Sequence, residues 1–196
     1  MSDTINNLIC ELSKLPGVGE KTATRLAFFI LRQPSGYAQC LAKALIDVKE
    51  RVKLCSVCLN LTEKSPCGIC SDANRDDSMI CVVEEPSDVI AVEKTRQFRG
   101  KYHILHGTIS PLDGIGPDDI KIKELVKRIE TSKIKEVIIA TNASIEGETT
   151  ALYLTKILKP KEVTLSRIAS GVPIGSNLEY IDASTLSRAF EARRQL

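Results

Sequence analysis

Apolar and polar residues follow two different periods along residues 79–194, and together they predict a mixed α/β domain. Short runs rich in Val and Ile are typical of buried strands, whereas apolar residues three and four apart are typical of amphipathic helices. Alternating strands and helices indicate a mainly parallel sheet with right-handed crossovers. The predicted strands span 79–85, 101–107, 136–141 and 162–168, and the predicted helices span 86–95, 120–132, 147–160 and 180–194.

The N-terminal part of the chain is helical in pattern but has a sharp break, which predicts two helices joined by a hairpin. Residues 20–31 show the apolar spacing of an amphipathic helix. Pro16 disfavours helical backbone at Leu15, so the preceding helix must end before this point. Gly17 and Gly19 allow a tight turn with positive φ.

The predicted hairpin also carries groups that suit a phosphate. Amides at Gly17, at Gly19 and at the start of the second helix point outward, where a phosphate oxygen can accept their hydrogen bonds. Lys21 and Arg25 lie four residues apart on one face of that helix, ready for phosphate contacts. This pattern resembles the helix-hairpin-helix motif of proteins that bind DNA without sequence specificity. An ordinary helical turn with solvated charges is the alternative, and Pro-Gly-Val-Gly followed by a lysine favours DNA binding.

Four cysteines form two Cys-x-x-Cys pairs with eight residues between them: Cys55, Cys58, Cys67 and Cys70. Each pair brings two sulfurs to one side of a tight turn, so the two pairs can surround one Zn²⁺ tetrahedrally. Four thiolates leave no position for a substrate, which predicts one structural zinc ion per chain. Disulfides are the alternative, disfavoured in an intracellular protein. A zinc finger that reads DNA is a second alternative, but the acidity of this segment argues for a role in folding instead.

Composition and charge favour an intracellular protein whose basic end is N-terminal. The first residues lack the basic start and apolar run of a secretory signal, and no stretch reaches the ~18 to 20 apolar residues that cross a membrane. We therefore expect a cytoplasmic, nucleoid-associated protein with no membrane partner. The formal net charge is +2 and a tetrathiolate zinc centre would nearly cancel it, so only a local patch could bind nucleic acid. Residues 1–54, with eight basic and five acidic side chains, are that basic part.

The three remaining cysteines, Cys10, Cys40 and Cys81, lie among apolar residues in the sequence. Free cysteine behaves as a small apolar residue and is among the residue types most often buried. We therefore expect all three to be buried thiols without a reactive role.

Acidic residues follow two of the predicted strands at their carboxyl ends, where parallel sheets gather their binding sites. Glu84 ends the first strand, Asp88 lies at the start of its helix, and the third strand runs into Glu146-Gly147-Glu148. This order resembles the Toprim domain of topoisomerases and primases, in which a glutamate, an Asp-x-Asp motif and a Glu-Gly-Glu motif hold Mg²⁺. Asn142 and Ser144 stand where the two aspartates would be.

The loss of both aspartates argues against catalysis, because Mg²⁺ is held by carboxylates and water and needs their charge to activate a phosphoryl centre. We expect no enzymatic activity, and we interpret Glu84, Asp88 and Glu146 as an acidic remnant that binds a basic partner protein. A Mg²⁺-dependent nuclease or topoisomerase-like enzyme that uses Glu84 and Glu146 is the alternative.

The order of the modules resembles that of the RecR family of bacterial recombination mediators over nearly all 196 residues. The resemblance implies a helix-hairpin-helix module at 1–54, a C4 zinc finger at 55–70, a degenerate Toprim domain at 78–175 and a tail that contacts other copies at 176–196. Further stretches typical of the family are SPLDGIGPDDI, ATNASIEGE and SRIASGVPIGSNLEY.

The resemblance implies a DNA repair and recombination function in which a ring-like homo-oligomer, mostly a tetramer, acts as a DNA clamp. It implies binding to gapped DNA and to junctions of single- and double-stranded DNA, with RecO and RecF as partners. Together they would help load RecA onto DNA coated by single-strand-binding protein, in a RecBCD-independent pathway.

Overall fold

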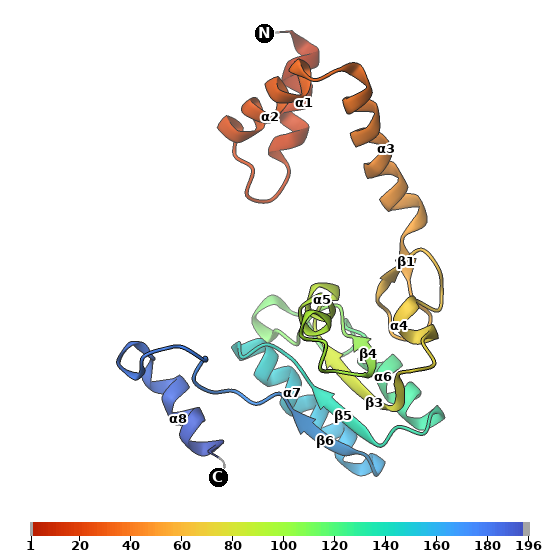
Figure 1. Cartoon of the computed structure of the whole chain (residues 1–196), viewed down its shortest axis with the longest axis vertical. Helices are drawn as coiled ribbons and strands as arrows, with labels where there is room; N and C mark the ends of the chain where they lie inside the picture. Colours follow the sequence, from red (N-terminus) through yellow and green to blue (C-terminus); the bar gives the residue numbers. More distant parts are fainter. Residues whose placement is uncertain (1, 194–196) are drawn as a thin grey trace. The chain divides into compact units, whose positions relative to one another are not determined.

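The structure, a computed structural model, describes residues 2–193 and divides into two compact units, Met1–Val52 and Lys53–Leu196 (Figure 1). The first unit contains α1 (Asp3–Ser13), α2 (Glu20–Arg32) and α3 (Ser35–Arg51). Between residues 2 and 193, no helix is both long and apolar enough to span a membrane.

A small core joins α1 to α2. Ala23 and Ala27 of α2 are fully buried against Ile9 of α1, and the small alanine side chains let the two helices approach closely. The connecting turn places Gly17 at φ +78°, a left-handed conformation that favours glycine. Gly19 instead has extended backbone, with φ −77° and ψ 167°, so the expectation of positive φ holds for Gly17 alone.

The second unit begins with a small module and continues into a parallel sheet. The module consists of β1 (Lys53–Leu54), which pairs antiparallel with β2 (Leu61–Thr62), followed by the one-turn helix α4 (Gly68–Ser71). The remaining elements are β3 (Asp76–Val83), α5 (Pro86–Thr95), β4 (Gly100–Ile104), η1 (Pro111–Asp113), α6 (Ile122–Thr131), β5 (Glu136–Ile139), α7 (Ile145–Leu158), η2 (Lys159–Lys161), β6 (Thr164–Arg167), η3 (Leu178–Tyr180) and α8 (Ala183–Glu191).

The four strands of the larger sheet pair in parallel in the order β4-β3-β5-β6, which confirms the predicted α/β class. Alternate residues of β3 face opposite sides of the sheet, as the two-residue period of a strand requires. Ile80 and Val82 pack in one core with α6 and α7. Cys81 and Val83 pack in a second core with Val89 of α5 and with the cysteines of the small module.

The small module also covers the edge of the sheet at β4. The amide of Ile104 donates to the carbonyl of Cys58 over 3.0 Å, so a backbone group on the outer edge of β4 finds a partner. Unpaired edge strands invite pairing with other chains, and this contact removes part of that risk.

Two of the three cysteines expected to be buried are exposed. Cys81 is 2% exposed in the sheet, as predicted. Cys10 of α1 and Cys40 of α3 are exposed, so the prediction is wrong for both. The physical reason is that α1 buries only the face that meets α2, and that no residue of α3 is buried within the N-terminal unit.

Candidate metal centre and nucleic-acid interface

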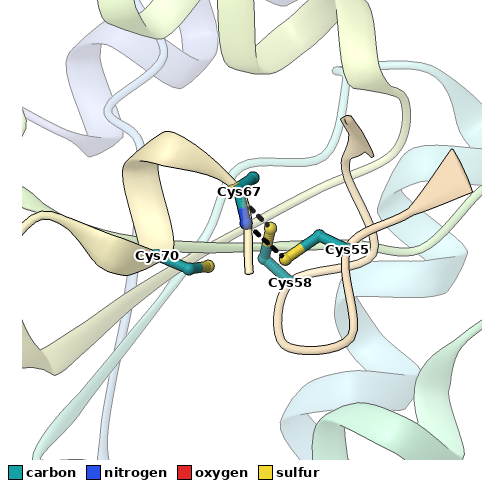
Figure 2. Close-up of side chains that lie close together, drawn as sticks. All are labelled: Cys55, Cys58, Cys67 and Cys70. Carbon is teal, nitrogen blue, oxygen red and sulfur yellow. Dashed lines mark hydrogen bonds between the residues drawn. The ribbon is translucent and has the colours of Figure 1, made fainter. Parts of the chain in front are cut away.

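Two tight turns of the small module bring the four cysteines together (Figure 2). The first turn closes with a hydrogen bond from the Leu59 amide to the Cys55 carbonyl, and Leu59 takes a left-handed φ of +65°. The second turn is the start of α4, where Cys67 is the residue before the helix and Cys70 lies within it. All four sulfurs lie within 4.8 Å of one another, and three of the four cysteines are buried.

The electrostatics of this cluster suit a divalent cation. Burial opposes ionisation of Cys55, but backbone N–H groups of Cys58, Cys67 and Val57 point at its sulfur and lower its pKa to about 6. The hydrogen bond with Cys70, followed by burial, raises the pKa of Cys58, and burial raises that of Cys67. Several thiolates so close together repel one another unless a cation lies between them. The four sulfurs therefore fit Zn²⁺, which binds thiolates in a closed tetrahedral site.

Lys21 and Arg25 lie on the exposed surface of α2, as the sequence predicted. Gly19 precedes the helix and brings no side-chain cap, so amides of the first turn are open to an external acceptor. Gly17 and Gly19 would meet no atom within 4 Å if they carried a Cβ, so the surface of the turn is open. Glu20, in the first turn of α2, offsets part of the positive potential there. The arrangement can bind a phosphate group without reading a base.

The acidic residues at the sheet end are held by neighbours within the chain. Glu84 is 6% exposed, and its carboxylate accepts from the Asn142 amide over 2.8 Å and from Asn142 Nδ2 over 2.5 Å. Asp88 accepts from the Glu85 amide in the capping box of α5, over 2.8 Å. Glu146 is half-buried in the first turn of α7. Glu84 therefore fixes the loop after β5 and does not present its carboxylate to a partner.

Within residues 2–193, the four cysteines are the one group of three or more His, Cys, Asp or Glu side chains close enough to hold a metal ion. The structure thus does not bring Glu84, Asp88 and Glu146 together as a ligand set for Mg²⁺.

Glu148, the last residue of the Glu-Gly-Glu motif, forms ion pairs with Arg167 at the end of β6 and Arg188 of α8. The hydrogen bond from Arg167, and then that from Arg188, hold the pKa of this carboxyl below its usual range. The three side chains line a cavity of about 780 Å³ beyond the carboxyl ends of β5 and β6. In the sequence, Glu148 stands out only as the last residue of the Glu-Gly-Glu motif, because nothing in the pattern places Arg188 beside it.

Two further residues that sequence reasoning missed contact the backbone of the cysteine cluster. Lys101 of β4 and Arg128 of α6 are both directed at the small module. Burial lowers the pKa of the Arg128 guanidinium, and the sulfurs of Cys70, Cys58 and Cys55 oppose that shift. The available signal was Lys101 itself, a charged residue in β4, a strand that is buried along its whole length.

Comparison with known proteins gives four adjoining family matches. The family models are the RecR helix-hairpin-helix, the RecR zinc finger domain of the four-cysteine type, the Toprim domain and the RecR C-terminal region. They match residues 5–49, 52–72, 78–169 and 171–194, in that order. The second match, together with the close sulfur atoms, shows that the chain carries a structural zinc site.

Curated relatives are similar over the whole chain. "Recombination protein RecR" of Heliobacterium modesticaldum is 55% identical, with 100% of this chain and 98% of that protein covered. The protein of the same name from Syntrophotalea carbinolica is 54% identical, with 98% and 97% covered. That from Geobacter sulfurreducens is 55% identical, with 100% and 98% covered.

Proposed function

The chain belongs to the RecR family, and from this premise we propose that it is a DNA repair and recombination mediator that works as an adaptor and not as an enzyme. The observation that carries the proposal is the exposed pair Lys21 and Arg25, beside open helix amides. These groups suit a phosphate backbone, which every DNA sequence presents alike.

We propose that several copies act together as a clamp on gapped DNA and on junctions of single- and double-stranded DNA. Two cations per chain give weak binding that salt erodes quickly, whereas linked copies raise the effective concentration of each further contact. The family resemblance supports a tetrameric ring with a helix-hairpin-helix module at 1–54, a zinc module at 55–70, a Toprim domain at 78–175 and an oligomer contact at 176–196. The part of this tail beyond residue 193 lies outside the described residues.

We further propose that RecO and RecF are the partners of this protein. With them it would help load RecA onto DNA coated by single-strand-binding protein. This would take place in the cytoplasm, on the nucleoid. A basic partner would meet the acidic end of the sheet through Asp88 and Glu146. Glu84 would act there indirectly, because its hydrogen bonds to Asn142 hold the loop that precedes Glu146.

The same contacts support the proposal that the chain is not an enzyme. Asn142 lacks the negative charge of the aspartate that Toprim enzymes carry at this position, and the N–H groups of its backbone and side chain donate to the carboxylate of Glu84. Mg²⁺ would therefore find neither the charge nor the free oxygens that it needs. The alternative, a Mg²⁺-dependent nuclease, predicts strand scission that disappears in Glu84→Gln, and that result would replace our proposal.

Salt dependence of DNA binding tests the adaptor proposal. We expect Lys21→Ala with Arg25→Ala to weaken binding on all sequences alike and to reduce the slope of log K against log salt by about 1.4 to 1.8 per bound chain. Fluorescence anisotropy with labelled oligonucleotides over a range of NaCl concentrations would measure both effects. The matched control is Lys156→Ala with Lys159→Ala, which removes two exposed lysines that lie outside the helix-hairpin-helix module. An unchanged slope, or a loss on some sequences only, would contradict the proposal.

A further inference from the structure

Lys101 is a buried cation whose hydrogen bonds all go to one side of the zinc module. It lies in β4 and is 4% exposed. Its Nζ donates to the carbonyls of Ile69 at 3.0 Å, Cys70 at 3.1 Å and Asp72 at 2.8 Å, which lie in and just after α4. Three simultaneous donations require the three N–H groups of an ammonium, so this side chain is charged.

The acidic group nearest to Lys101 cannot account for its burial. Asp77 lies 3.4 Å from Nζ, but its side chain is 88% exposed, so water screens most of that attraction. A buried ammonium is costly unless an opposite charge and hydrogen bonds compensate it. The carbonyls supply the hydrogen bonds. The carboxylate of Asp72 also attracts Lys101, but it is partly exposed and is shared with Arg75, so it compensates the charge only in part.

Arg128 plays the equivalent part on the other side of the zinc module. It lies in α6, and its Nη1 donates to the carbonyl of Val57 over 3.3 Å and to that of Tyr102 over 2.6 Å. Val57 lies between Cys55 and Cys58, the first pair of ligands. Arg128 thus joins the first cysteine turn to β4, whereas Lys101 joins the second cysteine turn to the same strand.

A zinc ion with four thiolates carries a net charge of −2, which is the charge that two nearby cations offset. We propose that Lys101 and Arg128 are positioning residues of the zinc centre: each holds the backbone of one cysteine pair, and together they compensate the charge of the tetrathiolate. Groups that orient metal ligands tune affinity by about 10- to 100-fold in other metal sites. The sheet domain is accordingly a part of the zinc site and not only its neighbour.

Zinc release to a chelator tests this assignment. We expect Lys101→Met and Arg128→Gln each to release zinc about 10- to 100-fold faster than the unaltered protein at pH 7.4, with 4-(2-pyridylazo)resorcinol as the indicator. Arg128→Lys, which keeps the charge and loses the planar fork, should release zinc at an intermediate rate. Lys94→Met and Lys127→Gln remove exposed charges from α5 and α6 and serve as matched controls that release zinc at the unaltered rate.

The thermal unfolding midpoint of the same proteins separates a role in the zinc centre from a role in the fold alone. Faster release from Lys101→Met or Arg128→Gln, at a temperature well below the midpoint of that variant, supports the proposal. A lowered midpoint with an unaltered release rate would overturn it, since both residues would then serve only the packing of β4 and α6. If Lys101→Met does not fold, Arg128→Gln and Arg128→Lys decide by the same criterion.

Discussion

His103 shows how a buried side chain can tie stability to pH. It lies fully buried in β4, where Nε2 is 2.8 Å from the carbonyl of Lys121 and therefore donates to it. Among the described residues, Nδ1 has no hydrogen-bond partner. Burial lowers the pKa of His103 to about 4, and the positive charge of nearby Arg128 acts in the same direction. The folded protein thus holds this ring neutral at pH values where the unfolded chain would protonate it.

Acidification should therefore weaken the fold through His103. The pKa of His103 is lower in the folded than in the unfolded state. Its contribution to the free energy of unfolding is therefore fully present above pH ~6.5 and is lost as the pH drops towards 4. Between pH 7.5 and pH 5 we expect about 2 kcal/mol of the free energy of unfolding to be lost through this residue. Urea unfolding with zinc in excess would measure it. His103→Gln keeps a donor towards Lys121 and should flatten the dependence; an equally steep loss in the variant would refute this account.

The predictability of the site residues follows from how far apart their partners lie in the sequence. The cysteines could be identified because ligand spacing is a local property of the chain. Lys101 and Arg128 could not, since the carbonyls they bind belong to other elements. The hydrogen bonds of Glu84 could not be predicted for the same reason, because their donor, Asn142, lies 58 residues away in the sequence.

The sequence predicted the types of the helices and strands better than the residues at which they begin and end. The helix over 86–95 has the predicted bounds, because Pro86 and the Glu85–Asp88 capping box mark its start. The strand expected over 101–107 ends at Ile104, since His106 and Gly107 take φ values of +57° and +137° and turn the chain. The last helix, expected over 180–194, begins at Ala183 because Asp182 caps it through the Thr185 amide.

Gly147 sets how closely α7 approaches the loop after β5. A Cβ at this position would lie 2.2 Å from the Asn142 carbonyl oxygen and 2.7 Å from Glu84 Oε1, and real contacts are essentially never so short. We therefore expect Gly147→Ala to lower the free energy of unfolding by about 1 to 3 kcal/mol, because the backbone must move to admit the methyl group. Urea unfolding followed by circular dichroism would measure the loss.

Gly36→Ala is the matched control for that substitution. Gly36 lies in the first turn of α3, and a Cβ there would meet nothing within 4 Å. The same change should be neutral or should stabilise by up to about 1 kcal/mol, since alanine loses less backbone freedom than glycine on folding. A loss at Gly36 as large as that at Gly147 would show that the crowding argument is wrong.

At the scale of the whole molecule, α3 carries an apolar surface that its own unit leaves exposed. It has 17 residues and buries none of them, although it carries several large apolar side chains. Tyr37, Leu41, Leu45, Ile46 and Val48 are 40% to 65% exposed. In proteins a helix is stabilised mainly by packing of its apolar face, so these residues need a cover that the rest of the N-terminal unit does not supply. Since we propose a ring of several copies, we expect that cover to be a second copy.

If several copies form a closed ring, retention of the protein on DNA should depend on whether the DNA has free ends. We expect the zinc-loaded protein to stay on circular gapped DNA at raised salt and to be lost once the circle is cut, because a clamp that binds only the backbone slides along it and leaves at a free end. Gel filtration of the DNA before and after linearisation would measure retention. Leu45→Glu, which places a charge on the apolar surface of α3, should abolish retention on the circle as well. Equal retention on circular and linear DNA would mean side-on binding and would rule out the clamp.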